Sequence, residues 1–213
     1  MPGRAWLLVA MALAIGSLVA WIQAPQVQAA MEWRPGLAGL AGLAGHEPWR
    51  AVTAAWLHWS PQHLIANLAG CAVVGLLGVA ARLTARDAAA WLLAWPLTQF
   101  GLLIEPTLER FGGASGVLHA GVAVAAIGMM RMRASHGRER VIGLLIGLGL
   151  IVKVAAERPL SAPALRHWDG WNIAIAPLAH LTGLLAGVAT ALLCALAARA
   201  WMRRASGGTS RRA

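Results

Sequence analysis

Two side chains able to perform nucleophilic chemistry, Ser115 and His180, stand in otherwise apolar parts of this sequence. Ser115 lies in the glycine-rich run Gly-Ala-Ser-Gly at 113–116, and His180 lies near the start of the last apolar segment. A serine hydroxyl is a weak nucleophile until a neighbouring base removes its proton, and histidine titrates in the pH range that suits such a base. If the fold brings the two together, this pair can attack a carbonyl carbon.

His63 and Asn67 form a second polar pair, four residues apart in another apolar segment. Residues at this spacing share one face of a helix, and Ser60 and Pro61 mark the helix start as N-cap and first-turn proline. Side-chain N–H donors of this kind can stabilise an oxyanion. They can equally hydrogen-bond a neighbouring membrane helix, so the residues alone leave both roles open.

Glycines lie on both sides of the serine and follow the histidine at helical spacing. Gly113 and Gly116 permit irregular backbone ahead of a helix that begins near Ser115, whose free N–H groups and partial positive charge would meet a developing oxyanion. Gly183 and Gly187 lie on the same helix face as the histidine and form a close-packing pattern of membrane helices. We therefore expect the histidine-bearing helix to pack closely against a neighbour. A glycine- and serine-rich helix cap without catalysis gives the same pattern around Ser115, and a single histidine hydrogen-bonded to a loop gives the same pattern at 180.

The composition indicates a membrane protein. Hydrophobic residues make up 59% of the chain and charged residues 12%, against about 25% charged residues in an average soluble domain. Apolar segments of about 17–25 residues are long enough to span a bilayer. We predict an all-α polytopic membrane protein, a single domain over 1–199, with six transmembrane helices at 5–22, 61–80, 88–104, 114–130, 141–157 and 177–199.

The placement of the charges orients the chain. With the N-terminus in the cytoplasm, the whole net charge of +10 lies on the cytoplasmic side, as the positive-inside rule requires. The basic composition is thus explained without nucleic acid as a partner. Both termini are then cytoplasmic, and the basic tail at 200–213 is expected to be disordered. A signal peptide ending near residue 29 is the alternative for the first segment, although its apolar run is longer than usual.

The polar side chains within these segments lie at similar depths. Measured along ideal helices from the arginine at each cytoplasmic end, Ser115 lies about 24 Å up, Asn67 about 22 Å, and His63 and His180 about 28 Å. The hydrocarbon core is about 30 Å thick, so all four lie in its outer third, on three helices. Polar groups at such positions indicate function.

No carboxylate is expected at this depth. Glu105, Glu109, Glu157 and Asp169 are all expected at the outer edge or in loops. A two-residue dyad of Ser115 and His180, without an acid, is therefore the expected serine-type arrangement.

Taken in order, these motifs resemble the rhomboid family of intramembrane serine proteases. The matching residues are Trp49-Arg50, His58, His63 with Asn67, Gly113-Ala114-Ser115-Gly116, and Ala179-His180 with Gly183 and Gly187. The resemblance implies a six-helix rhomboid-like bundle that cleaves peptide bonds in or near transmembrane segments of membrane-anchored substrates. It implies Ser115 as nucleophile, His180 as base, and an oxyanion hole made by His63, Asn67 and the Ser115 N–H. It implies no cofactor and no metal.

The run Gly-Ala-Ser-Gly-Val-Leu-His at 113–119 and the sequence Pro-Trp-Arg at 48–50 are most similar to the rhombosortase branch. That branch processes C-terminal Gly-Gly anchor segments of exported proteins in Gram-negative bacteria. It implies a location in the bacterial inner membrane, with the active site open to the periplasm. The position four after the serine, a tyrosine in many rhomboids, is His119, which can stack on His180, hydrogen-bond it or serve the structure alone. The role of His58 is left open.

Other functions predict different patterns. A non-catalytic rhomboid-like protein would bind helices without cutting them, but such relatives usually lack the serine or the histidine. A small transporter would carry polar residues along a path through the midplane, whereas these cluster toward one side. A metal site built from His58, His63 and His180 would have no acidic ligand.

Overall fold

The computed structural model describes residues 2–36, 47–132 and 137–209. Within these ranges the chain forms helices and two isolated β-bridges, without a strand. The elements are α1 (Arg4–Trp21), α2 (Pro25–Met31), α4 (Arg50–Thr53), the 3₁₀ turn η1 (Ala54–Trp56), α5 (Pro61–Ala80), α6 (Ala85–Phe100), η2 (Gly101–Ile104), α7 (Ser115–Met130), α8 (Gly137–Ala156) and α9 (Pro177–Thr209).

Polar caps determine where two of the long helices begin. The Ser60 hydroxyl accepts a hydrogen bond from the His63 N–H at the start of α5, which confirms the predicted N-cap. Thr84 and Asp87 form a capping box, so α6 begins at Ala85 instead of at 88. The apolar pattern could not show this earlier start because the capping residues are polar.

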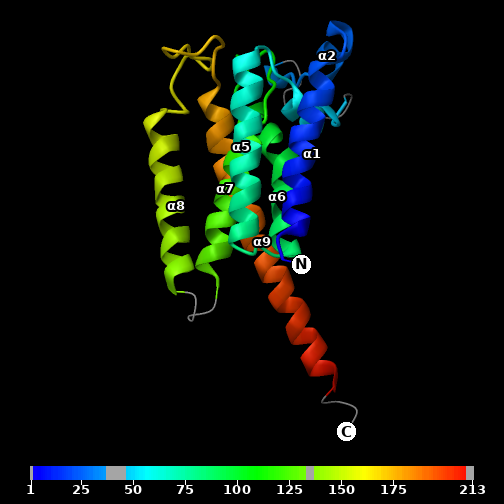
Figure 1. The fold of residues 1–213 in the computed structure, drawn as a ribbon, viewed down its shortest axis with the longest axis vertical. Coiled ribbons are helices and arrows are strands. Elements are labelled where there is room, and N and C mark those ends of the chain that lie inside the picture. Colours follow the sequence, from blue (N-terminus) through cyan, green and yellow to red (C-terminus); the bar gives the residue numbers. More distant parts are fainter. Residues whose placement is uncertain (1, 37–46, 133–136, 210–213) are drawn as a thin grey trace.

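The last two helices extend beyond the apolar segments that predicted them. α8 begins at Gly137 instead of 141, and α9 continues to Thr209 instead of ending at 199. Alanine and arginine favour helix, so α9 continues where a disordered tail was expected; residues 210–213 lie outside the described residues. Figure 1 shows this end of α9 projecting beyond the other helices.

Four helical stretches of the described chain are long and apolar enough to cross a membrane: Arg4–Trp21, Pro61–Ala80, Ala85–Ile104 and Pro177–Arg204. α7 is apolar but shorter, at 16 residues. α8 has 20 residues, but it carries charged residues in its first turn and Lys153 near its end. Length and composition therefore support four of the six predicted spans, and the other two stay predictions.

α7 is surrounded by other helices. It packs against α5, α6, α8 and α9, while α1 packs against α5 and α6 (Figure 1). The indoles of Trp6 and Trp91 pack together with ring centroids 4.5 Å apart. Their N–H groups donate to the carbonyls of Val74 and Val117, each at 2.8 Å. Because Val117 lies in the first turn of α7, this core fixes the helix that begins at Ser115.

α7 and α9 approach each other closely, as the glycine pattern predicted. A Cβ atom at Gly183 would lie 2.0 Å from the Gly116 carbonyl oxygen, and one at Gly187 would lie 2.4 Å from the Ala120 carbonyl oxygen. Both distances are far below van der Waals contact, so only glycine fits at either position. This contact places the N-terminal turns of the two helices, which carry the serine and the histidine, side by side.

Candidate active site

Gly113 shapes the backbone ahead of α7. Its φ of 133° lies in a region that other residues rarely adopt, and its N–H donates to the Ala54 carbonyl at 2.8 Å. A Cβ atom there would lie 2.8 Å from His63 Nε2. Glycine thus lets the chain pass beside His63 and begin α7 at Ser115, where no side chain caps the first N–H groups.

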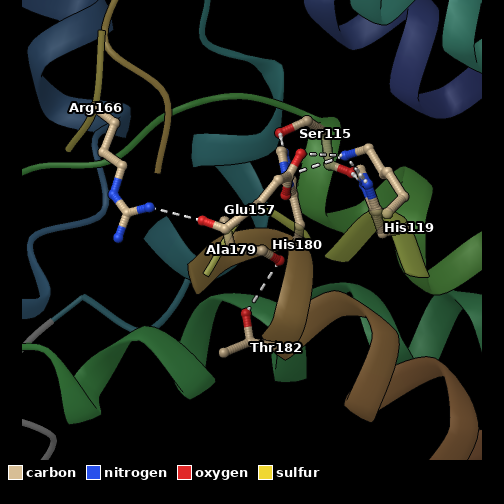
Figure 2. Close-up of polar contacts among 8 residues, drawn as sticks. Ser115, His119, Glu157, Arg166, Ala179, His180 and Thr182 are labelled. Atoms are coloured by element: carbon tan, nitrogen blue, oxygen red, sulfur yellow. Dashed lines mark hydrogen bonds and ion pairs between the residues drawn. The ribbon is translucent and has the colours of Figure 1, made fainter. Parts of the chain in front are cut away.

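Ser115 and His180 meet across the contact between α7 and α9. Ser115 Oγ lies 3.1 Å from His180 Nε2, which is a hydrogen-bond distance. His180 is 5% exposed, whereas Ser115 is partly exposed. The two residues singled out in the sequence are therefore brought together (Figure 2). The imidazole is buried and the hydroxyl is accessible.

A carboxylate lies behind the histidine, contrary to the expectation from the sequence. Glu157 Oε2 is 2.6 Å from His180 Nδ1, and Glu157 is 6% exposed. The expectation that no carboxylate reaches this depth is wrong because Glu157, the residue that follows α8, turns its side chain toward α9 and not into the loop. Figure 2 shows Glu157 and His180 side by side.

Lys153 joins Glu157 to the ring of His119. Its Nζ lies 2.7 Å from Glu157 Oε1 and 2.7 Å from His119 Nε2. On its other side, His119 Nδ1 lies 2.6 Å from the Ser115 carbonyl oxygen. The His119 ring also stacks on the His180 ring, with centroids 4.1 Å apart. Of the roles considered for His119, the structure therefore shows the stacking on His180.

His63 and Asn67 line the same cavity as Ser115 and His180. Asn67 Nδ2 donates to the His63 carbonyl at 3.2 Å, which uses one of the two amide protons. No hydrogen bond joins either side chain to Ser115 within the described ranges. The structure thus brings the four predicted residues to one cavity, and the oxyanion role of His63 and Asn67 stays a prediction.

His58 lies outside the helices and packs against His63. The two ring centroids are 4.7 Å apart, and His58 Nδ1 lies 3.1 Å from the Trp56 carbonyl oxygen. Burial lowers the pKa of His58 to about 4, so this ring is neutral at neutral pH and supports its neighbour by packing. The described residues contain no group of three His, Cys, Asp or Glu side chains placed to hold a metal ion.

A cavity of about 590 Å³ opens over the serine and the histidine. Its walls away from the polar groups are largely apolar and aromatic: Trp59, Leu118, Leu165, Trp168, Trp171 and Ile173. The three indoles are each about two-fifths exposed, at 41%, 40% and 37%. An apolar cavity with a few polar groups at one place suits a ligand with apolar side chains.

Arg166 organises the loop 158–176, which forms one wall of this cavity. Its guanidinium donates to the carbonyls of Glu157, Arg158 and Ser161, at 2.8, 2.9 and 2.6 Å. Figure 2 shows the contact between Arg166 and the Glu157 backbone. The loop therefore begins with a tight turn that fixes the main chain of Glu157.

The far part of the same loop is tied to the first turn of α5. The Ser60 hydroxyl donates to Asn172 Oδ1 at 2.7 Å, and Gln62 Nε2 donates to the Gly170 carbonyl at 2.6 Å. The loop thus bridges from the end of α8 to the start of α5, across the cavity.

Glu157 and Lys153 are not among the site residues predicted from the sequence. A signal was available, because a lysine inside a bilayer-length apolar segment is costly unless it has a partner. A carboxylate four residues later lies on the same helix face and supplies one. The spacing of these two residues could therefore have marked them as a functional pair.

The family comparison covers the part of the chain that carries this site. The family model of the Rhomboid domain matches residues 45–197, well over half of the 213 residues. Comparison with individual curated proteins gives no match. The matched stretch contains α5, α6, α7 and α8, most of α9, and every side chain of the site described above. The chain therefore belongs to the rhomboid family.

Proposed function

We propose that this protein is an intramembrane serine endopeptidase in which Ser115 is the nucleophile and His180 its base. The observation that carries the proposal is the 3.1 Å separation of Ser115 Oγ from His180 Nε2 beside an apolar-walled cavity. Membership of the rhomboid family supports it, because members of this family are generally intramembrane serine proteases that act on membrane-anchored substrates.

In the proposed reaction, His180 Nε2 takes the hydroxyl proton as Ser115 Oγ attacks the carbonyl carbon of the scissile bond. The protonated ring then gives this proton to the leaving amine, and water hydrolyses the acyl-enzyme with the same base. The oxyanion would form at the N-terminus of α7, where free N–H groups and the helix dipole favour negative charge. We assign its donors to the Ser115 N–H, the His63 ring and the second amide proton of Asn67.

We further propose where the protein works and what it cuts. The charge distribution favours a multi-pass protein of the bacterial inner membrane, with six spans, both termini in the cytoplasm and the cavity open to the periplasm. The sequences at 48–50 and 113–119 favour C-terminal Gly-Gly anchor segments of exported proteins as substrates.

A rhomboid-like protein that binds helices without cutting them is the second candidate. Such a protein would have no need for a serine hydroxyl within hydrogen-bond distance of a buried imidazole. The contact between Ser115 and His180 therefore disfavours it.

The proposal is tested with purified protein in liposomes and a test substrate that has one transmembrane segment. Ser115→Ala and His180→Ala should each abolish cleavage, because the first removes the nucleophile and the second its base. Ser17→Ala in α1 and His167→Ala in the exposed loop are matched controls that should keep wild-type rates. Cleavage that survives in Ser115→Ala would overturn the proposal, and binding without cleavage by the wild type would favour the second candidate.

The substrate class needs a separate test in the host. Deletion of this protein should leave exported proteins with Gly-Gly C-terminal segments uncut, as seen by the mass of their C-terminal peptides. Normal processing in the deletion strain would remove the Gly-Gly proposal and leave the protease proposal intact.

A further inference from the structure

The carboxylate of Glu157 is shared between two partners. Oε2 lies 2.6 Å from His180 Nδ1, and Oε1 lies 2.7 Å from Lys153 Nζ. The side chain is 8% exposed, and its backbone carbonyl accepts from Arg166 at 2.8 Å. Both the main chain and the side chain of Glu157 are thus held in place at the end of α8.

The donors and acceptors of this cluster fix where each imidazole carries its proton. A carboxylate only accepts hydrogen bonds, so the nitrogen that faces it, His180 Nδ1, must carry a proton. In the neutral ring the other nitrogen, Nε2, is then bare and able to accept from the Ser115 hydroxyl at 3.1 Å. This is the tautomer that a base requires.

The partners of His119 fix its proton in the same way. An ammonium only donates, so His119 Nε2 accepts from Lys153 at 2.7 Å. The proton of His119 must then lie on Nδ1, which donates to the Ser115 carbonyl at 2.6 Å. The 3.3 Å approach of Lys153 Nζ to His180 Nδ1 joins two donors, so it is not a hydrogen bond.

We propose that Glu157 is a positioning residue that holds His180 in its Nδ1–H tautomer, and that Lys153 fixes the orientation of the residue 157 side chain by holding the oxygen that does not face the histidine. The site then works as a Ser115–His180–Glu157 arrangement and not as a dyad without an acid. This inference rests on the proposed function, because it concerns how the proposed base is kept ready.

Glu157→Gln is the decisive substitution, because it keeps the shape and changes only the hydrogen-bonding groups. The Lys153 ammonium attracts the amide oxygen and repels the amide NH₂, so the NH₂ faces His180 Nδ1. That nitrogen must then accept, which moves the ring proton to Nε2 and leaves Ser115 without a base. We expect kcat to fall by about 100-fold or more, with KM changed less than about threefold.

Lys153→Met in the Glu157→Gln background tests the second half of the proposal. Without the ammonium, the amide can turn its oxygen toward His180 Nδ1 and restore the productive tautomer. The double variant should therefore cleave at least about tenfold faster than Glu157→Gln alone, although it departs further from the wild-type sequence. A residue that served only the packing of α8 would show no such recovery.

Two single variants complete the series. Lys153→Met alone should lose less than about tenfold in kcat, because Glu157 still accepts from His180. Glu109→Gln makes the same chemical change at an exposed glutamate outside the cavity, and it should leave kcat unchanged. Thermal unfolding of each purified variant identifies any that fail to fold.

The outcomes separate this inference from the proposed function. A kcat for Glu157→Gln within about threefold of the wild type would overturn the role of Glu157. A double variant no faster than Glu157→Gln would overturn the role of Lys153. Cleavage that persists in Ser115→Ala would instead overturn the serine-protease proposal on which both roles rest.

Discussion

The site is assembled from two contacts of different kinds. α7 and α9 meet backbone to backbone, because Gly183 and Gly187 leave no side chain between them and the carbonyls of the facing helix. α8 buries few residues, and it reaches the site through the side chains of Lys153 and of Glu157, which follows it. The nucleophile and the base are therefore placed by contacts that allow no adjustment, whereas the groups behind the base are placed by hydrogen bonds that can rearrange.

The largest effect is expected where the backbones touch. In Gly183→Ala, the new methyl group would lie 2.0 Å from the Gly116 carbonyl oxygen, so α9 must move away from α7. A shift of this size separates His180 from Ser115, and we expect cleavage to fall by about 100-fold or more, with a lower thermal unfolding midpoint. Gly149→Ala is the matched control in α8, because a Cβ there meets nothing within 4 Å. Equal activity of the two variants would show that the contact between α7 and α9 adjusts as easily as the contacts made by α8.

The stacked ring of His119 should matter less, because it contacts His180 through its side chain and not through the backbone contact between α7 and α9. His119→Ala removes both the stack on His180 and the hydrogen bond to the Ser115 carbonyl, and we expect kcat to fall by about tenfold, equivalent to about 1.4 kcal/mol. His119→Phe keeps an aromatic ring against His180, and an aromatic pair contributes about 0.5–1.5 kcal/mol. Its kcat should therefore lie between those of the wild type and His119→Ala. A His119→Phe variant no better than His119→Ala would show that the ring stacking is unimportant.

The Arg166 contacts should contribute to stability more than to chemistry. Arg166→Met leaves three carbonyls of the turn after α8 without their donor, and we expect the free energy of unfolding to fall by about 1 kcal/mol. Cleavage should fall only a few-fold, because the side chain of Glu157 keeps its own partners. Limited proteolysis within 158–176 measures the loosened turn directly. Arg140→Met, at the other end of α8, is the control and should leave that loop resistant.

The smallest effect on cleavage is expected at the N-cap of α5. Ser60→Ala removes the acceptor for the His63 N–H and the donor to Asn172, so the free energy of unfolding should fall by about 1 kcal/mol. His63 and Asn67 stay on the same helix face, and cleavage should change less than about twofold. Ser60→Thr keeps the hydroxyl and should restore the lost stability. A large loss of cleavage in Ser60→Ala would mean that the cavity depends on this tie.

The part of the site held by the backbone contact between α7 and α9 could also be predicted from the sequence. Glycine spacing at 183 and 187 predicted the close helix contact, and the polar residues of three apolar segments predicted the cavity that Ser115, His180, His63 and Asn67 share. Both predictions depend only on helical periodicity and rise, which the apolar segments imposed on α5, α7 and α9. Helix boundaries at Ala85 and Thr209 were less predictable, because capping and basic residues carry no apolar signal.

The carboxylate was missed for a specific reason. The sequence analysis expects Glu157 at the outer edge, but the helical rise used for the other helices places it about 26 Å above Arg140, at the depth of Ser115 and His180. Depth alone could not show that its side chain turns inward, because that depends on the Arg166 turn and on the position of α9. The sequence could thus indicate that Glu157 lies at the depth of Ser115 and His180. Only the fold could show that its carboxylate contacts His180.

The aromatic walls of the cavity also give the protein an optical property. The chain contains 11 tryptophans, two phenylalanines and no tyrosine, so indole dominates its near-ultraviolet emission. Trp6 and Trp91 are fully enclosed, while Trp59, Trp168 and Trp171 border the cavity beside the serine. A substrate helix that carries a fluorescence quencher will shorten the emission lifetime of the tryptophans at the cavity when it occupies the cavity. It will affect the enclosed tryptophans less. Substrate occupancy can therefore be followed in the unlabelled protein, separately from bond cleavage.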